Sequence, residues 1–197
     1  MKKLLILLII AISFTSAAQS PIFPLNDWDD EIPNAYYKDL NNELDTFEGT
    51  WLYTSGNTSW KLQLKKQTMV FNDKYYEDLI VGEYKYIKNG LEVINTLSNI
   101  NSASGYQHDI TGNSVYNGCD YLPPSNCIDG ENRLILTLSD PVTGHAATII
   151  LHKRVVNGQE AILAYVIFDQ LSSYDGYSQP KPEPTMPWQQ EYMLIKQ

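Results

Sequence analysis

Beyond the first quarter of the chain, the sequence alternates between apolar and polar positions with a period of two residues. In the clearest stretch, WKLQLKK, the residues Trp60, Leu62 and Leu64 fall on one face, and lysine and glutamine occupy the positions between them. Such alternation is typical of a strand with one buried and one solvated face. Trp51 and Tyr53 share a face in the same way, so the pattern predicts a strand there as well.

Two hairpins are indicated by their turns. Asn-Gly pairs at 89–90 and 157–158 each separate two apolar runs, and this dipeptide is a strong signal for a two-residue hairpin turn. Further runs at 133–138 and 191–196 bring the total to about eight strands with almost no helix. Sequential hairpins favour an all-β, antiparallel up-and-down barrel, which leaves no free edge; a two-sheet sandwich is the alternative. A barrel of this size is either filled by side chains or holds one small ligand.

Three segments depart from this rhythm. Apolar residues recur at every fourth position within 34–45, which predicts a short helix with Asn34 as its N-cap. Residues 98–131 are rich in Asn, Gly and Ser and exceed an ordinary connection in length, which predicts an ordered excursion or a functional loop. Residues 171–188 contain four prolines, so we expect an extended segment there and no central strand.

The N-terminus has the pattern of a secretory leader. Two lysines, an apolar run and small residues before the cleavage point predict a signal peptide over 1–18, cut after Ala18. The apolar run is shorter than the roughly 20 residues of a membrane-spanning helix. We expect an exported protein that does not span the membrane, in the periplasm or outside the cell; an uncleaved anchor is the alternative. Residues 19–46 should form an arm and the short helix, and 47–197 a single barrel domain.

Charge and cysteine content narrow the partners and the compartment. The chain has 14 basic and 23 acidic residues and a formal charge of −9; without the two leader lysines it has 14 − 2 = 12 basic residues and a charge of −11. Nucleic acid is an unsuitable partner for so acidic a chain, because its phosphates would be repelled. Cys119 and Cys127 are expected to form a disulfide in an oxidising compartment. Closing so short a loop contributes about 2–3 kcal/mol.

The stretch FEGTW resembles the glycine-x-tryptophan motif of lipocalins, in which the glycine lets the chain turn into the barrel and the tryptophan plugs its closed end. Gly49 and Trp51 match these two positions, so the resemblance implies a structural role for both. Lipocalins pack this tryptophan against an arginine of the last strand, where the present chain has Lys196. Their threonine-aspartate-tyrosine turn motif is not evident.

Most of the chain also resembles an uncharacterised family of short secreted bacterial proteins, a domain of unknown function. The similarity is carried by residues 31–59, 75–101, 156–162 and 191–197. This resemblance implies export and a lipocalin-like fold. It implies no activity, because none is established for the family.

Residues suited to catalysis or metal binding form no recognisable motif. His108, His145 and His152 are separated along the chain, and His152 is expected on a strand surface beside basic residues. The GxSxG elbow of serine hydrolases is absent, and both cysteines are assigned to the disulfide. The acidic NDWDDE segment lacks the glycine of an EF-hand loop. We therefore predict no enzyme, no cofactor and no metal site, with a hydrolase and an irregular calcium site as the alternatives.

Aromatic residues are abundant, with 14 tyrosines, 4 tryptophans and 5 phenylalanines. We expect Trp60, Tyr84, Tyr86 and Tyr121 to line a ligand site in the barrel mouth, opposite the Trp51 end, with the disulfide loop as its lid. The predicted function is non-enzymatic binding of a small apolar or aromatic-stacking ligand. The alternative is an interaction or structural protein of the cell envelope or surface with a filled barrel, whose protein partner the sequence does not identify.

Overall fold

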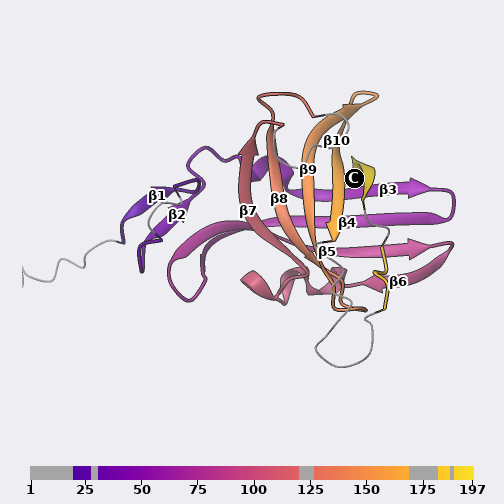
Figure 1. The fold of residues 1–197 in the computed structure, drawn as a ribbon, viewed down its shortest axis with the longest axis horizontal. Helices are drawn as coiled ribbons and strands as arrows, with labels where there is room; N and C mark the ends of the chain where they lie inside the picture. Colours follow the sequence, from indigo (N-terminus) through magenta and orange to yellow (C-terminus); the bar gives the residue numbers. More distant parts are fainter. Residues whose placement is uncertain (1–19, 28–30, 120–126, 169–181, 187–188) are drawn as a thin grey trace, which may run out of the picture.

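The computed structural model describes residues 20–27, 31–119, 127–168, 182–186 and 189–197 (Figure 1). The strands are β1 (Ile22–Pro24), β2 (Tyr36–Lys38), β3 (Gly49–Ser55), β4 (Thr58–Phe71), β5 (Tyr76–Lys88), β6 (Leu91–Asn95), β7 (Ile110–Asn117), β8 (Asn132–Ser139), β9 (Ala146–Val156), β10 (Gln159–Phe168) and β11 (Gln190–Lys196). Three 3-10 turns accompany them: η1 (Leu44–Phe47), η2 (Leu97–Asn101) and η3 (Gly105–Gln107). The expected signal peptide and Tyr121 lie outside the described residues.

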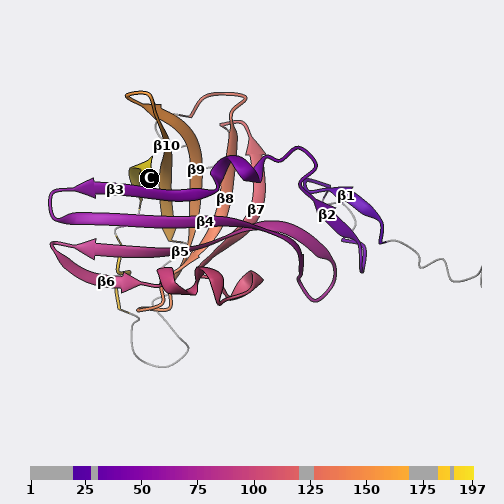
Figure 2. The same ribbon diagram turned by 180° about the vertical axis from the view of Figure 1, so that it is seen from behind.

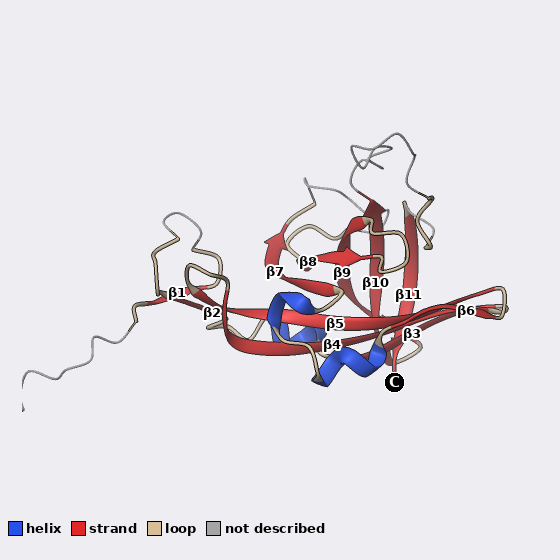
Figure 3. Ribbon diagram, turned by 90° about the horizontal axis from the view of Figure 1, so that it is seen from below, coloured by secondary structure: helices blue, strands red, loops and turns tan. Residues whose placement is uncertain are grey.

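Eight of the described strands close into an antiparallel barrel. Their order around the barrel is β3, β4, β5, β7, β8, β9, β10 and β11, and the β11–β3 and β5–β7 pairings close the ring. Strands β7 to β11 stand on one side of the layer formed by β3 to β6, as Figure 3 shows. Apart from β6, which pairs with β5, barrel strands that follow one another in the sequence also lie side by side in the barrel. The predicted lipocalin-like up-and-down fold class is therefore confirmed.

The interior is built from the alternating positions that the sequence pattern indicates. Trp60 and Leu62 on β4 lie directly opposite Tyr86 and Tyr84 on β5, and all four are buried in one continuous core. Farther along β5, a Cβ atom at Gly82 would lie 2.6 Å from a methyl group of Leu64 and 3.0 Å from a backbone oxygen. The two strands approach closely at this glycine because no side chain separates them.

The helix predicted over 34–45 is wrong. Residues 36–38 instead form β2, which pairs in parallel with β1 and with the start of β5, and only the η1 turn precedes β3. Hydrogen bonds explain the difference: the Tyr36 hydroxyl donates to the distant Asp78 at 2.5 Å, and Asp39 accepts locally from the backbone N–H groups of Glu43 and Leu44 at 2.9 and 3.0 Å. These bonds outweigh the four-residue spacing of the apolar side chains.

The excursion predicted over 98–131 contains a barrel strand. Turns η2 and η3 lie against the outer face of β4 and β5, where Ile100 packs on Leu79 and Val81, and β7 then enters the barrel wall between β5 and β8. The register of β7 against β8 shifts between Thr111 and Ser114, so the strand shows no regular alternation in its sequence. The eighth barrel strand is therefore β7, whereas β6 extends the sheet beside β5.

The predicted disulfide between Cys119 and Cys127 is present, with Cα atoms 5.8 Å apart. Its loop connects β7 to β8, and Asn132 at the start of β8 donates to the Glu43 carboxylate at 3.0 Å, next to η1. The disulfide loop therefore leaves the barrel at the Trp51 end. The expectation that it covers the opposite end is wrong, because in the up-and-down order the β7–β8 connection lies at the same end of the barrel as the start of β3.

Candidate functional site

Three of the four aromatic residues predicted to line a ligand site lie together inside the barrel. Trp60, Tyr84 and Tyr86 have at most 1% of their surface exposed. The ring centroid of Trp60 lies 5.1 Å from that of Tyr192 in an edge-to-face contact, and the Tyr84 hydroxyl donates to the Ser139 carbonyl at 3.0 Å. Burial raises the pKa of Tyr84. All three side chains belong to one continuous core of buried residues.

The described interior contains a buried polar atom that lacks a hydrogen-bond partner. The Trp60 indole Nε1 is buried and has no acceptor among the described residues, whereas the indole Nε1 of Trp51 donates to the Phe47 carbonyl at 3.0 Å. A buried donor without an acceptor lowers stability by about 1–3 kcal/mol. The interior of the barrel therefore has an unused hydrogen-bond donor beside its aromatic cluster.

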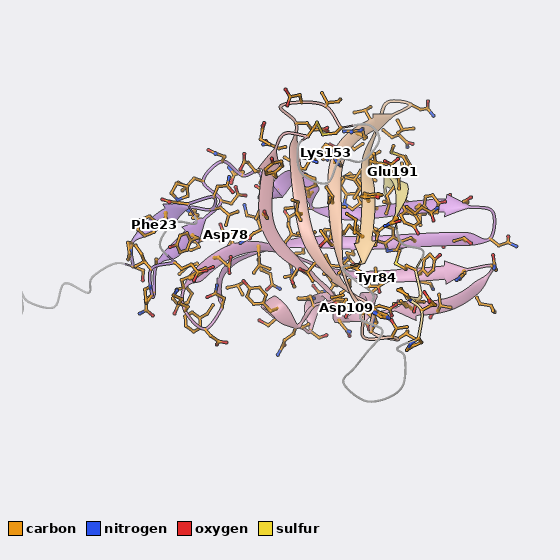
Figure 4. All side chains as sticks on the ribbon, in the orientation of Figure 1. Phe23, Asp78, Tyr84, Asp109, Lys153 and Glu191 are labelled. Atoms are coloured by element: carbon orange, nitrogen blue, oxygen red, sulfur yellow. A yellow bond between two sulfur atoms is a disulfide. The ribbon has the colours of Figure 1, made fainter. Side chains whose placement is uncertain are left out.

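Trp51 and Gly49 lie at the end of the barrel that η1 covers. The ammonium groups of Lys153 and Lys196 lie 4.8 and 5.3 Å from the Trp51 ring centroid. Lys196 thus occupies the place of the arginine that packs on this tryptophan in lipocalins. Gly49 has a φ of 134°, and a Cβ atom there would lie 3.2 Å from the Lys196 side chain, so both backbone conformation and space favour glycine. Figure 4 labels Lys153 near this end and Tyr84 with Asp109 near the other.

The end opposite Trp51 is covered by the described segment 182–186. Met186 is buried in the core, and the carboxylate of Asp140 accepts from the Thr185 backbone N–H at 2.7 Å and the Thr185 hydroxyl at 3.2 Å. His145 Nε2 lies 2.7 Å from the Pro182 carbonyl, so it donates there. Burial alone would raise the pKa of Asp140, but these and neighbouring hydrogen bonds lower it. The described residues 182–186 of the proline-rich segment, for which the sequence predicts an extended course, therefore lie over this end of the barrel.

A groove on the outside of the barrel separates the far end of the β4–β5 hairpin from η3. We call it the hairpin groove; its main part has a volume of about 760 Å³. An adjoining part is also lined by Tyr75 and Glu77. The side chains of Met69, Phe71 and Tyr106 are between 46% and 55% exposed beside it. Across both parts the lining comprises Gln67, Thr68, Met69, Val70, Phe71, Asn72, Asp73, Tyr75, Glu77, Ser104, Gly105, Tyr106 and Gln107.

Glu77 is the fixed polar group of the hairpin groove. Its side chain is buried, Oε1 accepts from the Tyr106 hydroxyl and from Asn72 Nδ2 at 2.8 Å, and Oε2 accepts from Asn113 Nδ2. Burial and the neighbouring Glu77 carboxylate raise the pKa of Tyr106, which keeps that hydroxyl a donor. A carboxylate offers about four acceptor positions, so three donors leave Glu77 one position for a ligand.

Behind the groove lies a buried pair that joins β5 to the segment after η3. His108 Nδ1 is 2.8 Å from a Glu83 carboxylate oxygen, and the other ring nitrogen lies 3.4 Å from the Gln67 amide. Burial raises the pKa of the adjacent Asp109.

His152, expected on the surface, is also buried: it lies 3.4 Å from Glu131, and burial lowers its pKa. The surface prediction for His152 was wrong because strand parity does not reveal what covers an outward face.

Sequence reasoning could not assemble the hairpin groove. Phe71 and Tyr75 lie where the alternation of β4 ends, and Tyr106 lies in the segment read as an excursion. The one signal available was the high tyrosine content at strand ends and in loops.

Among the described residues, no cluster of three His, Cys, Asp or Glu side chains is arranged to hold a metal ion. No helix in the described ranges is long and apolar enough to cross a membrane.

The fold defines the class of this protein: a lipocalin-like, eight-stranded antiparallel barrel. Within that class, the chain belongs to the family of unknown function DUF6705, whose pattern it matches over residues 1–197. No curated protein and no solved structure matches the chain. The sequence resemblance to an uncharacterised family is thereby confirmed, and the family supplies no activity.

Proposed function

We propose that this protein is an exported, non-enzymatic binding protein that takes an aromatic-stacking, hydroxyl-rich ligand, a neutral oligosaccharide, in the hairpin groove. The observation that carries the proposal is the combination of exposed rings, Phe71 and Tyr106, with the buried acceptor Glu77 in one groove. Tyrosine and phenylalanine rings present flat apolar faces on which a sugar ring can stack. Convergent polar groups beside an apolar surface are the usual means of orienting a ligand.

Charge supports a neutral ligand. The described residues of the groove lining include Asp73 and Glu77 and no lysine or arginine. Because the chain is acidic overall, an anionic polymer would be repelled at this face. A sugar hydroxyl, in contrast, can donate to the acceptor position that Glu77 has free.

The hydrogen bonds of Glu77 and His108 favour binding of the ligand without hydrolysis. Glycoside hydrolysis requires two carboxyl groups, one of which donates a proton to the leaving oxygen. Glu77 is surrounded by three donors and acts as an acceptor, and His108 is engaged by Glu83 and Gln67. We therefore propose that the ligand is held and released unchanged.

Export is part of the proposal. The leader pattern over residues 1–18 predicts cleavage after Ala18, and the Cys119–Cys127 disulfide is of the kind that persists in oxidising compartments. Together they support a location in the periplasm or outside the cell. N-terminal sequencing of the protein recovered from its native compartment tests this, and an intact Met1 would contradict it.

Isothermal titration with neutral oligosaccharides, cellohexaose and maltohexaose first, tests the ligand assignment. Phe71→Ala should weaken binding about tenfold, since stacking of aromatic rings is worth about 0.5–1.5 kcal/mol beyond the buried area. Leu91→Ala, which truncates an exposed apolar side chain outside the groove lining, is the matched control and should bind as the parent does. Absence of binding across the panel, or equal affinity of parent and Phe71→Ala, would overturn the proposal.

The barrel interior is a second candidate, favoured by the unpartnered Nε1 of Trp60, which lies in the same buried core as Met186. A small apolar ligand with one acceptor atom would replace Met186 and accept from the indole. Tryptophan fluorescence titrated with a lipid and hydrophobic-dye panel tests this idea. A ligand whose affinity is the same for the parent and for Trp60→Phe would contradict it.

A further inference from the structure

A second groove lies on the opposite part of the β4–β5 surface, away from the hairpin groove. We call it the lysine groove; its volume is about 580 Å³, and it crosses the outer face of β3 to β6, the face turned to the reader in Figure 2. The lining residues are Leu52, Ser59, Lys61, Lys85, Ile87, Asn95, Leu97 and Ser98. The first turn of η2 supplies one wall, and the strands supply the floor.

The floor is ordered by strand register. Leu52, Lys61, Lys85 and Asn95 lie directly opposite one another on four successive strands, β3 to β6. They form one row across the sheet on its outer face, because the alternating positions, such as Trp60, point into the core. The row therefore runs from an apolar residue, through two lysines, to an amide, over about three strand spacings.

The two central lysines are an unfavourable pair in the absence of a ligand. Directly opposite residues in an antiparallel pair have Cβ atoms about 4.5–5.5 Å apart, and like charges at such positions destabilise a sheet. Lys85 is paired with Glu92 on β6, whereas no carboxylate among the described residues lies within ion-pair distance of Lys61. The row thus concentrates positive charge on a protein whose formal charge is −9.

Apolar side chains flank this charge. Leu52 lies beside Lys61 on the neighbouring strand, Ile87 lies two residues beyond Lys85 on the same face, and Leu97 contributes from η2. A simple inorganic anion would use the lysines and leave this apolar surface in water. A ligand that carries its anionic group on an apolar chain would use both.

We infer that the lysine groove binds a single-chain amphiphile with an anionic headgroup, the head between Lys61 and Lys85 and the chain along Leu52, Ile87 and Leu97. Charge complementarity selects the head, because it relieves the repulsion between the two lysines. Burial of the chain supplies affinity at about 25 cal/mol per Å² of apolar surface. The volume of the groove is within the range of small-molecule sites, about 300–1,000 Å³. This site is independent of the hairpin groove, so either can fail without the other.

Titration with sodium dodecanoate below its micelle concentration tests the inference. Binding is followed by the NMR signals of the Leu52 and Ile87 methyl groups, which report this groove directly. Dodecanoate and dodecyl phosphate should both bind, and dodecyl maltoside, which has the same chain and a neutral head, should bind at least tenfold more weakly. Raising the salt concentration should weaken dodecanoate binding, because exposed charge interactions are screened.

Substitutions separate the headgroup site from other modes of binding. Lys61→Gln and Lys85→Gln should each weaken dodecanoate binding about fivefold, as expected for an exposed charge pair, and the double variant more. Lys88→Gln, the same charge change on β5 outside the groove lining, is the matched control and should leave affinity unchanged. Without ligand, Lys61→Gln should unfold at no lower temperature than the parent.

Three results would overturn the inference. Equal affinity of the parent and the double lysine variant would place dodecanoate elsewhere, the barrel interior included. Equal affinity for dodecyl maltoside and dodecanoate would mean an apolar patch without headgroup recognition. Inorganic phosphate binding as tightly as dodecanoate would mean a plain anion site without a role for the apolar residues.

Discussion

Replacement of two fully buried tryptophans by phenylalanine should have unequal costs. Trp51 and Trp60 are both 0% exposed and lie on neighbouring strands of the same core. The indole of Trp51 donates to the Phe47 carbonyl at 3.0 Å, whereas the indole of Trp60 has no acceptor among the described residues. The two substitutions remove the same atoms, so the difference between them reports the surroundings of the two indoles: a hydrogen bond and two lysines at Trp51, and an unpartnered donor at Trp60.

The magnitudes follow from what each site loses. Both variants lose ring volume, which costs about 1–2 kcal/mol in a core that does not collapse. Trp51→Phe also leaves the Phe47 carbonyl without its donor, a penalty of about 1–3 kcal/mol, and weakens the attraction of Lys153 and Lys196 to the ring. We expect a cost of about 2–5 kcal/mol for Trp51→Phe. For Trp60→Phe we expect a cost of about 1 kcal/mol or less, because removing the unpartnered indole N–H offsets the lost ring volume. Trp51→Ala, which empties the plug, should cost about 3–5 kcal/mol.

Urea unfolding followed by far-UV circular dichroism, with the disulfide intact, measures these differences without relying on tryptophan emission. The slope of the transition should be the same for all variants, so that the midpoint alone reports stability. Equal costs for the two phenylalanine variants would refute the assignment of the Trp51 hydrogen bond. A change near zero for Trp51→Ala would refute its role as a plug.

Two further outcomes follow from packing and from titration. Gly82→Ala should destabilise the protein by about 1–3 kcal/mol in the same unfolding assay, because its Cβ would overlap Leu64 and press on Ile110; a gain in stability would contradict the close approach. The folded-state pKa of Asp140 is lowered, so its contribution is present above the unfolded pKa of about 3.9 and is lost as the pH falls through the folded value. Asp140→Asn should therefore cost stability at neutral pH, where Thr185 donates to the carboxylate, and the gap to the parent should narrow towards pH 3; a constant gap would count against this.

Local sequence rules identified the strands whose buried face is regular. β4 and the hairpins with Asn-Gly turns were predictable because alternation and turn chemistry act within a few residues of one another. β7 was not predictable, because a register shift interrupts its alternation. In addition, Asn113 on this strand donates a hydrogen bond to Glu77, which is distant in sequence. The 34–45 segment failed for the same reason, since Tyr36 and Asp39 form long-range bonds that no local pattern encodes.

The candidate sites divide in the same way. Aromatic composition pointed to stacking and to Trp60, Tyr84 and Tyr86, but whether a ring faces the core or a groove depends on neighbours from other strands. Phe71, Tyr106 and Glu77 come together because the η3 turn folds back on the distant β4–β5 hairpin. The Lys61–Lys85 row exists because β4 and β5 pair in one particular register.

The sequence by itself therefore determined the all-β class, an antiparallel barrel of about eight strands and the disulfide pair, and the resemblance to lipocalins predicts the structural role of Gly49 and Trp51. Each of these depends on spacing along the chain. Tertiary structure alone decided which strand completes the barrel, that segment 182–186 covers the mouth, and that the grooves lie outside a packed interior. The physical reason is that packing and pairing between distant segments, and not local periodicity, fix which side chains are buried and which surfaces stay open to a ligand.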